Sequence, residues 1–464
     1  MWCRMATSCT SGSMWANEMS QSTLFPLPPS EMYAADSARA ALEERYAPLM
    51  REALHMGKWV SYVGNKQVPG LRLYRYKEAF SERLVRHFMA RFAPEPGAVV
   101  FDPFSGLGTT AFVAMQQGYQ GIGIDRLPVA VLAARALSLL TTLLPGQLSQ
   151  AFARLQAQID AFAPAPVAED VRIMQLAFPP EVLEHLRRWK SAVATLDSPA
   201  REVMTLLLLA VLEPCSFTAK DGQFLRLRRE KRIADPDEAL AEKVRQAEID
   251  IAHFAKARQK SRWGALPQYH LADARDLTRV SFPQSPSLVI TSPPYANRYD
   301  YTRTYSLELA FAFVRNFEEL RALRHSVLRS HIESRLAAEE MTPHPAVEEV
   351  VTALSAKRLN NPRIPLMLQA YFVDMERVLA ELSRVLAPDG RVVMVVDNVR
   401  FEGEMVPVDL ILADLAARHG FHTEEILIAR YKGNSSQQMK KYGRVPVRES
   451  ILIWHKKASH PVGH

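Results

Sequence analysis

Two glycines and an acidic residue give the segment 101–110 the character of a ligand-binding turn. Its sequence, FDPFSGLGTT, continues an apolar run of strand length and contains Gly106 and Gly108. Glycine lets a backbone turn sharply and approach a ligand closely. The segment has neither the GxGxxG spacing of a dinucleotide site nor the lysine of a phosphate-binding loop. It predicts a strand, a tight turn and a helix, and the glycines serve either a ligand or the turn alone.

Asp125 ends the next predicted strand, YQGIGID. In doubly wound α/β sheets a carboxylate at the end of the second strand commonly binds ribose hydroxyls. The glycine turn and Asp125 together therefore favour a nucleoside-containing ligand, although neither feature is specific by itself.

A second polar turn, TSPPY at 291–295, follows the apolar run SLVI. Two consecutive prolines remove two backbone donors and stiffen the loop, so neighbouring carbonyls are held facing one way. A serine, a proline carbonyl and an aromatic ring at a strand end suit an exocyclic amine, because the oxygens accept its N–H groups and the ring stacks on the base. The alternative is a Pro-Pro turn with a packing tyrosine.

With both motifs in this order, the chain resembles the amino-methyltransferases of DNA. FDPFSGLGTT is similar to the family's cofactor motif, and TSPPY is similar to its catalytic tetrad of Ser, Asp or Asn followed by Pro-Pro and Tyr or Phe. The resemblance covers roughly 70–145 and 266–458. It extends weakly to LYRYKEAFSERLV, which is similar to the methionine-side helix but lacks its Lys-Phe-Pro core.

This resemblance implies S-adenosyl-L-methionine as the cofactor and assigns residues to it. HLADARDL matches the segment between the two motifs, and it places Asp273 where the family contacts the adenosyl base. The implied cofactor-binding residues are Asp102, Pro103, Phe104, Ser105, Gly106, Gly108, Thr109, Thr110, Asp125, Asp273 and Ala274. The implied catalytic residues are Ser292, Pro293, Pro294 and Tyr295.

The resemblance also implies the reaction. A base leaves the duplex because its amino group cannot meet the methyl group inside the stack. Tyr295 stacks on it, while Ser292 and the Pro293 carbonyl accept the amino hydrogens. Serine at the first tetrad position is most similar to the N4-cytosine branch, whereas aspartate is the usual form for adenine N6. Double-stranded DNA is the implied substrate.

The stretch after the tetrad, ANRYDYTRTYSLELAF, offers further base-pocket residues. We expect substrate contacts from Asn297, Tyr299, Asp300 and Arg303, with an ordinary polar loop as the alternative. A basic cluster at 224–232, FLRLRREKR, and basic residues at 315–335 are candidates for phosphate and groove contacts. Any single arginine can equally belong to a solvated face.

The order of motifs and periodic segments predicts a Rossmann-like class I methyltransferase fold. It is an α/β architecture with a mostly parallel, doubly wound sheet and a helical insertion. We expect a loosely packed tail at 1–35, a cofactor-binding half at 36–145 and a catalytic half at 266–464 with a polar helical insert near 300–362. Two regions, 146–265 and 300–362, are candidates for target recognition. The helical insertion at 146–265 is preferred because it is longer and carries the densest basic cluster.

The composition of the chain bears on its partner, its cellular setting and the presence of a metal site. The chain has 464 residues, is 48% hydrophobic and carries a net charge of +7, which suits a polyanionic partner without proving one. It has three cysteines and no CxxC pair or His/Cys cluster, so we expect a reducing, cytoplasmic setting and no metal site. Cys215 is interpreted as structural. Neither a signal peptide nor a membrane-spanning run is predicted.

Three other functions stay open at this point. They are adenine N6 methylation, amino-methylation of an RNA base, and a binding module whose motifs are vestigial. The intact glycines and tetrad argue against the last of these. The family also suggests monomeric action and a separately encoded restriction endonuclease.

Overall fold

A computed structural model describes residues 33–34, 36–92, 94–221, 224–335, 344–433 and 445–457. The expected N-terminal tail falls almost entirely outside these residues. None of the described helices is both long enough and apolar enough to cross a membrane.

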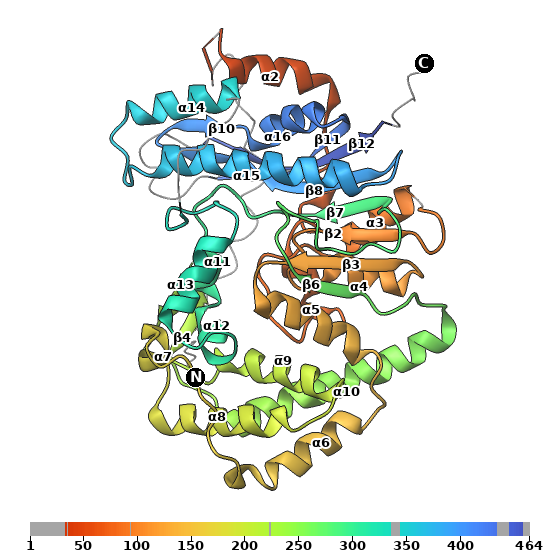
Figure 1. Ribbon diagram of the computed structural model, residues 1–464, viewed down its shortest axis with the longest axis vertical. Helices are drawn as coiled ribbons and strands as arrows, with labels where there is room; N and C mark the ends of the chain where they lie inside the picture. Colours follow the sequence, from red (N-terminus) through yellow and green to blue (C-terminus); the bar gives the residue numbers. More distant parts are fainter. Residues whose placement is uncertain are drawn as a thin grey trace, which may run out of the picture.

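One eight-stranded sheet organises the fold, in the order β1-β11-β12-β8-β7-β2-β3-β6 (Figure 1). All neighbouring pairs are parallel except those of β12, which runs antiparallel to both β8 and β11. The expected doubly wound α/β fold is therefore confirmed. The strands are β1 (Met50–Glu52), β2 (Val99–Asp102), β3 (Gln120–Asp125), β6 (Gln268–Leu271), β7 (Leu288–Thr291), β8 (Arg391–Asp397), β11 (Phe421–Lys432) and β12 (Val447–Lys456).

Apolar runs form these strands because both faces of the sheet are covered. Successive side chains point to opposite faces, so Phe101 packs in the core with the two helices of one face and Val100 packs with those of the other. Helices α15 (Ile364–Val385) and α16 (Val408–Arg418) cover the first face, and α3 (Glu82–Phe92) and α4 (Thr109–Gln116) cover the second.

The order of strands reverses between β2 and β7. From β2 the chain proceeds to β3 and β6 on one side, whereas β7 is followed by β8 on the other. In open α/β sheets this switch point, at the carboxyl ends of the strands, is where ligands bind. The glycine turn follows β2 and the proline turn follows β7, so the topology brings both turns to that point.

Below the sheet in Figure 1 lies a layer of helices from the insertion. A buried apolar cluster joins α5 (Pro128–Leu140) to this layer. The elements are α6 (Gln147–Gln156), α7 (Arg172–Leu176), α8 (Pro180–Ala194), α9 (Ala200–Leu212), α10 (Pro236–Lys260) and the hairpin of β4 (Thr218–Asp221) with β5 (Phe224–Leu227). Cys215 is fully buried in the same cluster. The hairpin carries the first residues of the 224–232 basic cluster, in a stretch that the sequence pattern predicts as mostly helical.

Two helix predictions are too long. The pattern predicts helices over 36–56 and 71–92, but α2 spans Ala38–Tyr46 and α3 begins only at Glu82. Pro48 lies in a short 3-10 turn after α2, and β1 follows. Residues 71–80 form turns whose tyrosines and apolar side chains are buried, which gives them a period that imitates a helix.

The polar block after β7 crosses from the sheet to the insertion. It contains α11 (Tyr301–Thr304), α12 (Ser306–Ala312), α13 (Phe317–Ser326) and α14 (Pro345–Ser355). In Figure 1 strands β2 and β3 point toward α11 and α13. A small hairpin of β9 (Val399–Phe401) and β10 (Glu404–Val406) follows β8.

Candidate active site

A cavity of about 370 Å³ lies at the carboxyl ends of β2, β3 and β7. Its size is in the range of small-molecule sites. Both predicted motifs line it, so the glycine turn and the proline turn share one cleft. The predicted residues on its wall are Pro103, Phe104, Ser105, Gly106, Thr109, Asp125, Asp273, Ala274, Ser292, Pro293, Pro294, Tyr295, Asn297 and Tyr299.

The glycine turn is held by Asp125. One carboxylate oxygen accepts the Gly106 N–H at 2.9 Å, and the other accepts the Leu127 N–H at 2.8 Å. Burial raises the pKa of Asp125 to about 6, against the lowering effect of these backbone bonds. At neutral pH the group is therefore a carboxylate at the cavity wall, able to accept hydroxyl hydrogens.

Gly108 has a positive φ of 82° and precedes α4. A Cβ at this position would lie 2.6 Å from the Cβ of Ala134 and 2.9 Å from the hydroxyl of Tyr269. Only glycine fits, because both the backbone conformation and the space forbid a side chain. Gly108 thus supports the turn from behind and does not line the cavity.

Asp102 and Thr110 join the two motif-bearing strands and do not face the cavity. The Thr291 hydroxyl donates to an Asp102 carboxylate oxygen at 2.6 Å, and the Thr110 hydroxyl donates to the Ile290 carbonyl at 3.0 Å. Burial raises the pKa of Asp102 to about 7. The residue before the tetrad and the acid before the glycine turn are therefore in direct contact.

At the proline turn, the Ser292 hydroxyl donates to the Val395 carbonyl of β8 at 3.2 Å. It also lies 3.4 Å from the Tyr295 hydroxyl, which donates to Glu449 of β12 at 3.1 Å. Burial, with Glu449 nearby, raises the pKa of Tyr295 well above its ordinary value. Tyr295 is therefore a neutral phenol whose ring orientation is fixed from behind.

Four charged residues stand around this tyrosine, and sequence reasoning assigned a role to none of them. Lys432 contacts Asp397 at 3.0 Å and Glu449 at 2.8 Å, and Arg430 forms an ion pair with Glu449. The Lys432 ammonium lies 5.7 Å from the centre of the Tyr295 ring. Burial raises the pKa of Asp397, against the lowering effect of Lys432.

Tyrosines form another part of the cavity wall; Tyr299 is a predicted substrate contact, whereas Tyr76 and Glu78 were not predicted as site residues. The hydroxyls of Tyr299 and Tyr305 both donate to Glu78, the latter at 2.6 Å. Tyr76 lines the cavity and stacks on Tyr305 with ring centres 4.9 Å apart. Their common segment, 76–80, belongs to the stretch that is similar to the family's methionine-side helix. Here it is irregular backbone.

Among the described residues, the site suits S-adenosylmethionine by its donor set. The hydroxyls of Ser105 and Thr109 are buried without a hydrogen-bond partner in the described chain. Asp125 supplies a ribose acceptor. Burial raises the pKa of Asp273, but hydrogen bonds and charge from Arg275 outweigh it and lower the value overall. The Asp273 side chain remains 33% exposed at the wall and can still accept an amine hydrogen.

Two predicted substrate residues lie outside the lining. Asp300 caps α11 by accepting the Thr302 N–H at 2.9 Å, and it contacts Arg324 at 3.0 Å. Arg303 is half-exposed beside Glu333, with the contact at 3.4 Å. Tyr301, which lies between these two residues in the sequence, does line the cavity.

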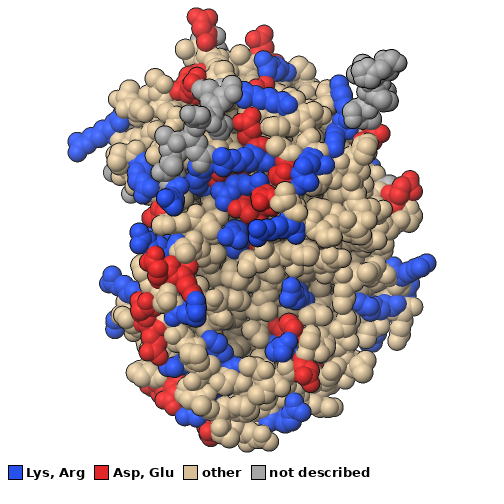
Figure 2. All heavy atoms as spheres, viewed as in Figure 1, with Lys and Arg blue, Asp and Glu red and all other residues tan. Residues whose placement is uncertain are grey.

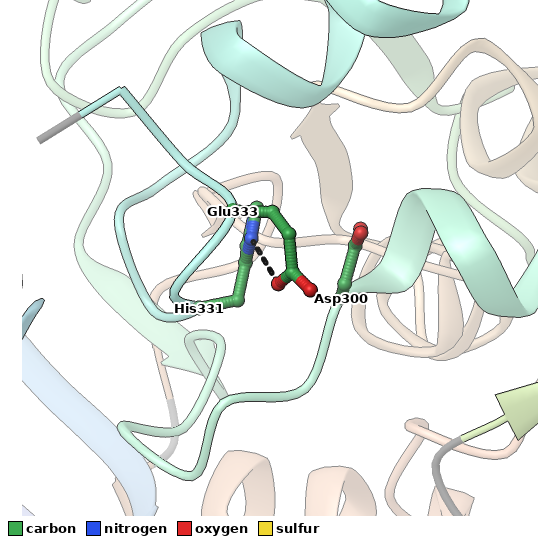
Figure 3. Close-up of side chains that lie close together, drawn as sticks. All are labelled: Asp300, His331 and Glu333. Carbon is green, nitrogen blue, oxygen red and sulfur yellow. Dashed lines mark ion pairs between the residues drawn. The ribbon is translucent and has the colours of Figure 1, made fainter. Parts of the chain in front are cut away.

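Asp300, His331 and Glu333 lie together beside α11 (Figure 3). His331 is fully buried and its Nδ1 is 3.8 Å from Glu333. Arg324 and Arg303 already pair with the two carboxylates, so the group has no excess negative charge to attract a cation.

The basic residues of 315–335 do not act as one surface. Arg329 is buried against Asp374 at 2.6 Å, and His331 is buried as well, so neither reaches a phosphate in this structure. Arg315 is 88% exposed but pairs with Glu319 on its own helix. This block therefore contributes less positive surface than its sequence suggests.

The chain is similar in sequence to known DNA methylases. A family model described as DNA methylase matches residues 49–135. The chain is 32% identical over 459 residues to the type II methyltransferase M.AvaI of Nostoc sp., covering 90% of this chain and 92% of the relative. It is 31% identical over 478 residues to the type II methyltransferase M.BsoBI of Geobacillus stearothermophilus, covering 91% and 93%.

Among solved structures, a ribosomal RNA methyltransferase, aviRa of Streptomyces viridochromogenes, matches 83% of this chain and 89% of its own at 13% identity and a TM-score of 0.31. The family assignment rests on the curated relatives, which are 31% to 32% identical and are matched over 90% or more of both chains. The chain belongs to the type II DNA methyltransferases of the N4/N6 amino-methyltransferase family, which use S-adenosyl-L-methionine.

Proposed function

We propose that this enzyme transfers the methyl group to N4 of a cytosine flipped out of double-stranded DNA, at a specific site. The observation that carries the proposal is the pairing of Ser292 and Tyr295 at the rim of the cofactor cavity. A serine hydroxyl at this position is neutral and donates to Val395, which leaves its oxygen lone pairs to accept an amine hydrogen. The serine form of the tetrad favours cytosine over adenine.

The cofactor, when bound, supplies an electrophilic methyl group on a sulfonium. The lone pair of the amine nitrogen would form the N–C bond to that methyl group, and the electron pair of the broken S–C bond would stay on sulfur. Ser292 and the Pro293 carbonyl orient the amine, so its lone pair faces the methyl group. The ring of Tyr295 supports the base face, and Glu449 and Lys432 fix that ring.

A proton must leave the amine during the transfer. Asp397 lines the same cavity, and one of its carboxylate oxygens, Oδ1, is buried without a hydrogen-bond partner among the described residues. Its pKa is raised by burial, which makes it a better acceptor than an ordinary carboxylate. We assign it the proton, with Lys432 holding the other oxygen at 3.0 Å.

DNA recognition fits the surface beside the cavity. Figure 2 shows Lys and Arg side chains gathered in a band across the upper middle of the face drawn there. Such charge supports phosphate contacts. We propose the insertion at 146–265 as the target-recognition region, because its hairpin stands next to α11. Monomeric action and a separately encoded endonuclease remain predictions.

The test is nucleoside mass spectrometry after incubation of the enzyme with unmethylated genomic DNA and cofactor. We expect N4-methylcytosine, with sequencing placing it in one recurring site. N6-methyladenine would overturn the choice of base, and methylation of RNA but not DNA would overturn the substrate. Ser292→Ala is the control, and it should lower the rate of methylation by about 100-fold or more.

A further inference from the structure

The hairpin of β4 and β5 presents apolar side chains to solvent next to the active-site cavity. Phe224 is 43% exposed and Leu227 is 38% exposed, although both are large apolar residues. Only Leu225 of the same strand packs against the apolar cluster of the insertion. An exposed aromatic ring beside arginines is a group on which a nucleic-acid base can stack.

The base of this hairpin is rigid. Lys220 is 3% exposed and forms an ion pair with Glu308, which is 2% exposed. The Lys231 ammonium donates to the carbonyls of Ser216 at 2.9 Å and Thr218 at 2.8 Å. A buried charge pair and multiple carbonyl contacts hold the strands in one orientation, so the exposed side chains are presented in a fixed direction.

Two contacts join the hairpin to the cavity wall. Lys77, which lines the cavity, donates to the Lys220 carbonyl at 2.5 Å. The Arg303 guanidinium lies 5.2 Å from the centre of the Phe224 ring, and Arg303 belongs to α11, whose first residue, Tyr301, also lines the cavity. Phe224 therefore stands beside the place where a flipped base would enter.

The basic residues of the hairpin indicate what kind of molecule this surface binds. The segment 224–232 has five basic residues and one acidic residue. Arg226 and Arg228 are 57% and 49% exposed, and they share one partner, Asp221, at 3.7 Å and 3.0 Å. A single carboxylate does not balance two guanidinium groups, so this surface favours a polyanion. The exposed ring of Phe224, with Arg226 on the same face of its strand, matches a nucleic-acid wedge, which inserts apolar side chains between base steps.

We propose that Phe224 of this hairpin enters the target duplex and lies against the bases next to the one that is flipped. The proposal rests on the base flipping in the proposed function. A flipped base leaves its neighbours unstacked, and an aromatic or aliphatic side chain in the gap covers their exposed faces. Arg226 and Arg228 then contact the flanking phosphates.

The test compares two substrates that carry the site found by sequencing. One is an intact duplex, and the other has the target base mismatched, so less energy is needed to extrude it. For Phe224→Ala, we expect methylation of the duplex to fall by about 10- to 100-fold, as stacking contacts predict. On the mismatched substrate the loss should shrink to a few-fold.

Three controls separate the wedge from other effects. Phe224→Leu keeps apolar bulk and should retain most of the activity. Ile249→Ala removes another apolar side chain, 63% exposed on α10, and should change nothing. Cofactor binding by calorimetry should be equal in all variants, which excludes misfolding.

Equal losses on both substrates, or no loss on the duplex, would overturn the wedge. The second result would assign the exposed apolar residues to another partner, such as a protein. If the unchanged enzyme methylates neither substrate, the proposed function itself fails, and the wedge fails with it.

Discussion

The glycine turn after β2 and the proline turn after β7 lie side by side, but they are held in different ways. Asp125 holds the first through backbone N–H groups only 19 and 2 residues away. The second depends on Val395 and Glu449, which lie 103 and 154 residues away from their partners. The cofactor side is thus a local structure, whereas the catalytic side is assembled from the far end of the chain.

This difference predicts how each turn fails. Damage to the glycine turn should affect folding and cofactor binding together, because the same short segment does both. Damage to the supports of the proline turn should lower the rate while the fold and the cofactor site persist. The following substitutions and pH measurements test this difference between the two turns.

Gly108→Ala should have the largest effect. Its φ of 82° and the 2.6 Å approach to Ala134 combine backbone strain with overpacking. We expect a loss of about 2–6 kcal/mol in unfolding free energy, measured by chemical denaturation. Gly97→Ala is the matched control, because it has a φ of 80° with nothing within 4 Å, and it should lose only about 1–2 kcal/mol. Equal losses would contradict the steric argument.

Thr291→Val tests the contact between the two turns. It removes the 2.6 Å hydrogen bond to Asp102 with little change in shape. We expect a loss of about 1–3 kcal/mol in unfolding free energy. Because burial raises the pKa of Asp102 to about 7, the carboxylate form is the one that needs the bond. The loss should therefore be greater at about pH 8 than at about pH 5, and the reverse order would contradict it.

Glu449→Gln tests the remote support of Tyr295. We expect kcat to fall about tenfold with little change in KM for cofactor, because the phenol loses a charged acceptor at 3.1 Å. Unfolding curves of the variant should show whether the fall in kcat comes from a loss of folding stability. In a Tyr295→Phe background, Glu449→Gln should have a smaller further effect. Full additivity of the two changes in steady-state kinetics would show that Glu449 does not act through Tyr295.

Cofactor affinity should depend modestly on pH. Burial raises the pKa of Asp125 to about 6, so the residue gains a proton as pH falls through that value and loses acceptor capacity. We expect affinity to weaken about tenfold between about pH 8 and about pH 5, measured by calorimetry. Asp125→Asn should bind weakly and flatten this profile. A steep profile in the variant would assign the titration to another group.

The difference between the locally held glycine turn and the remotely held proline turn explains which parts of the site the sequence could predict. The strands around Gly106, Asp125 and Ser292 are apolar runs that end in polar turns, and their order implies adjacent tips in a doubly wound sheet. Glu449 and Lys432 lie in late strands whose alternating pattern says nothing about which end of the sheet they face. Their place follows from β12 running antiparallel to β8, which is a tertiary feature.

At two places the sequence pattern gave a wrong prediction because the residues are buried. The buried side chains of 71–80 alternate with charged ones, and their spacing imitates a helix. The sequence predicts that Arg329 is a surface charge, but the residue is buried in an ion pair with Asp374 of α15. In both cases the partner lies in a distant element, so periodicity alone cannot reveal it.

The most direct test of the account is calorimetric titration of Ser292→Ala with S-adenosylmethionine, alongside its methylation rate on DNA. We predict cofactor affinity within about twofold of the parent and a rate reduced by about 100-fold or more, by analogy with the removal of one oriented polar group from an active site. Loss of cofactor binding in Ser292→Ala, or methylation at the parent rate, would contradict the division of work between the two turns.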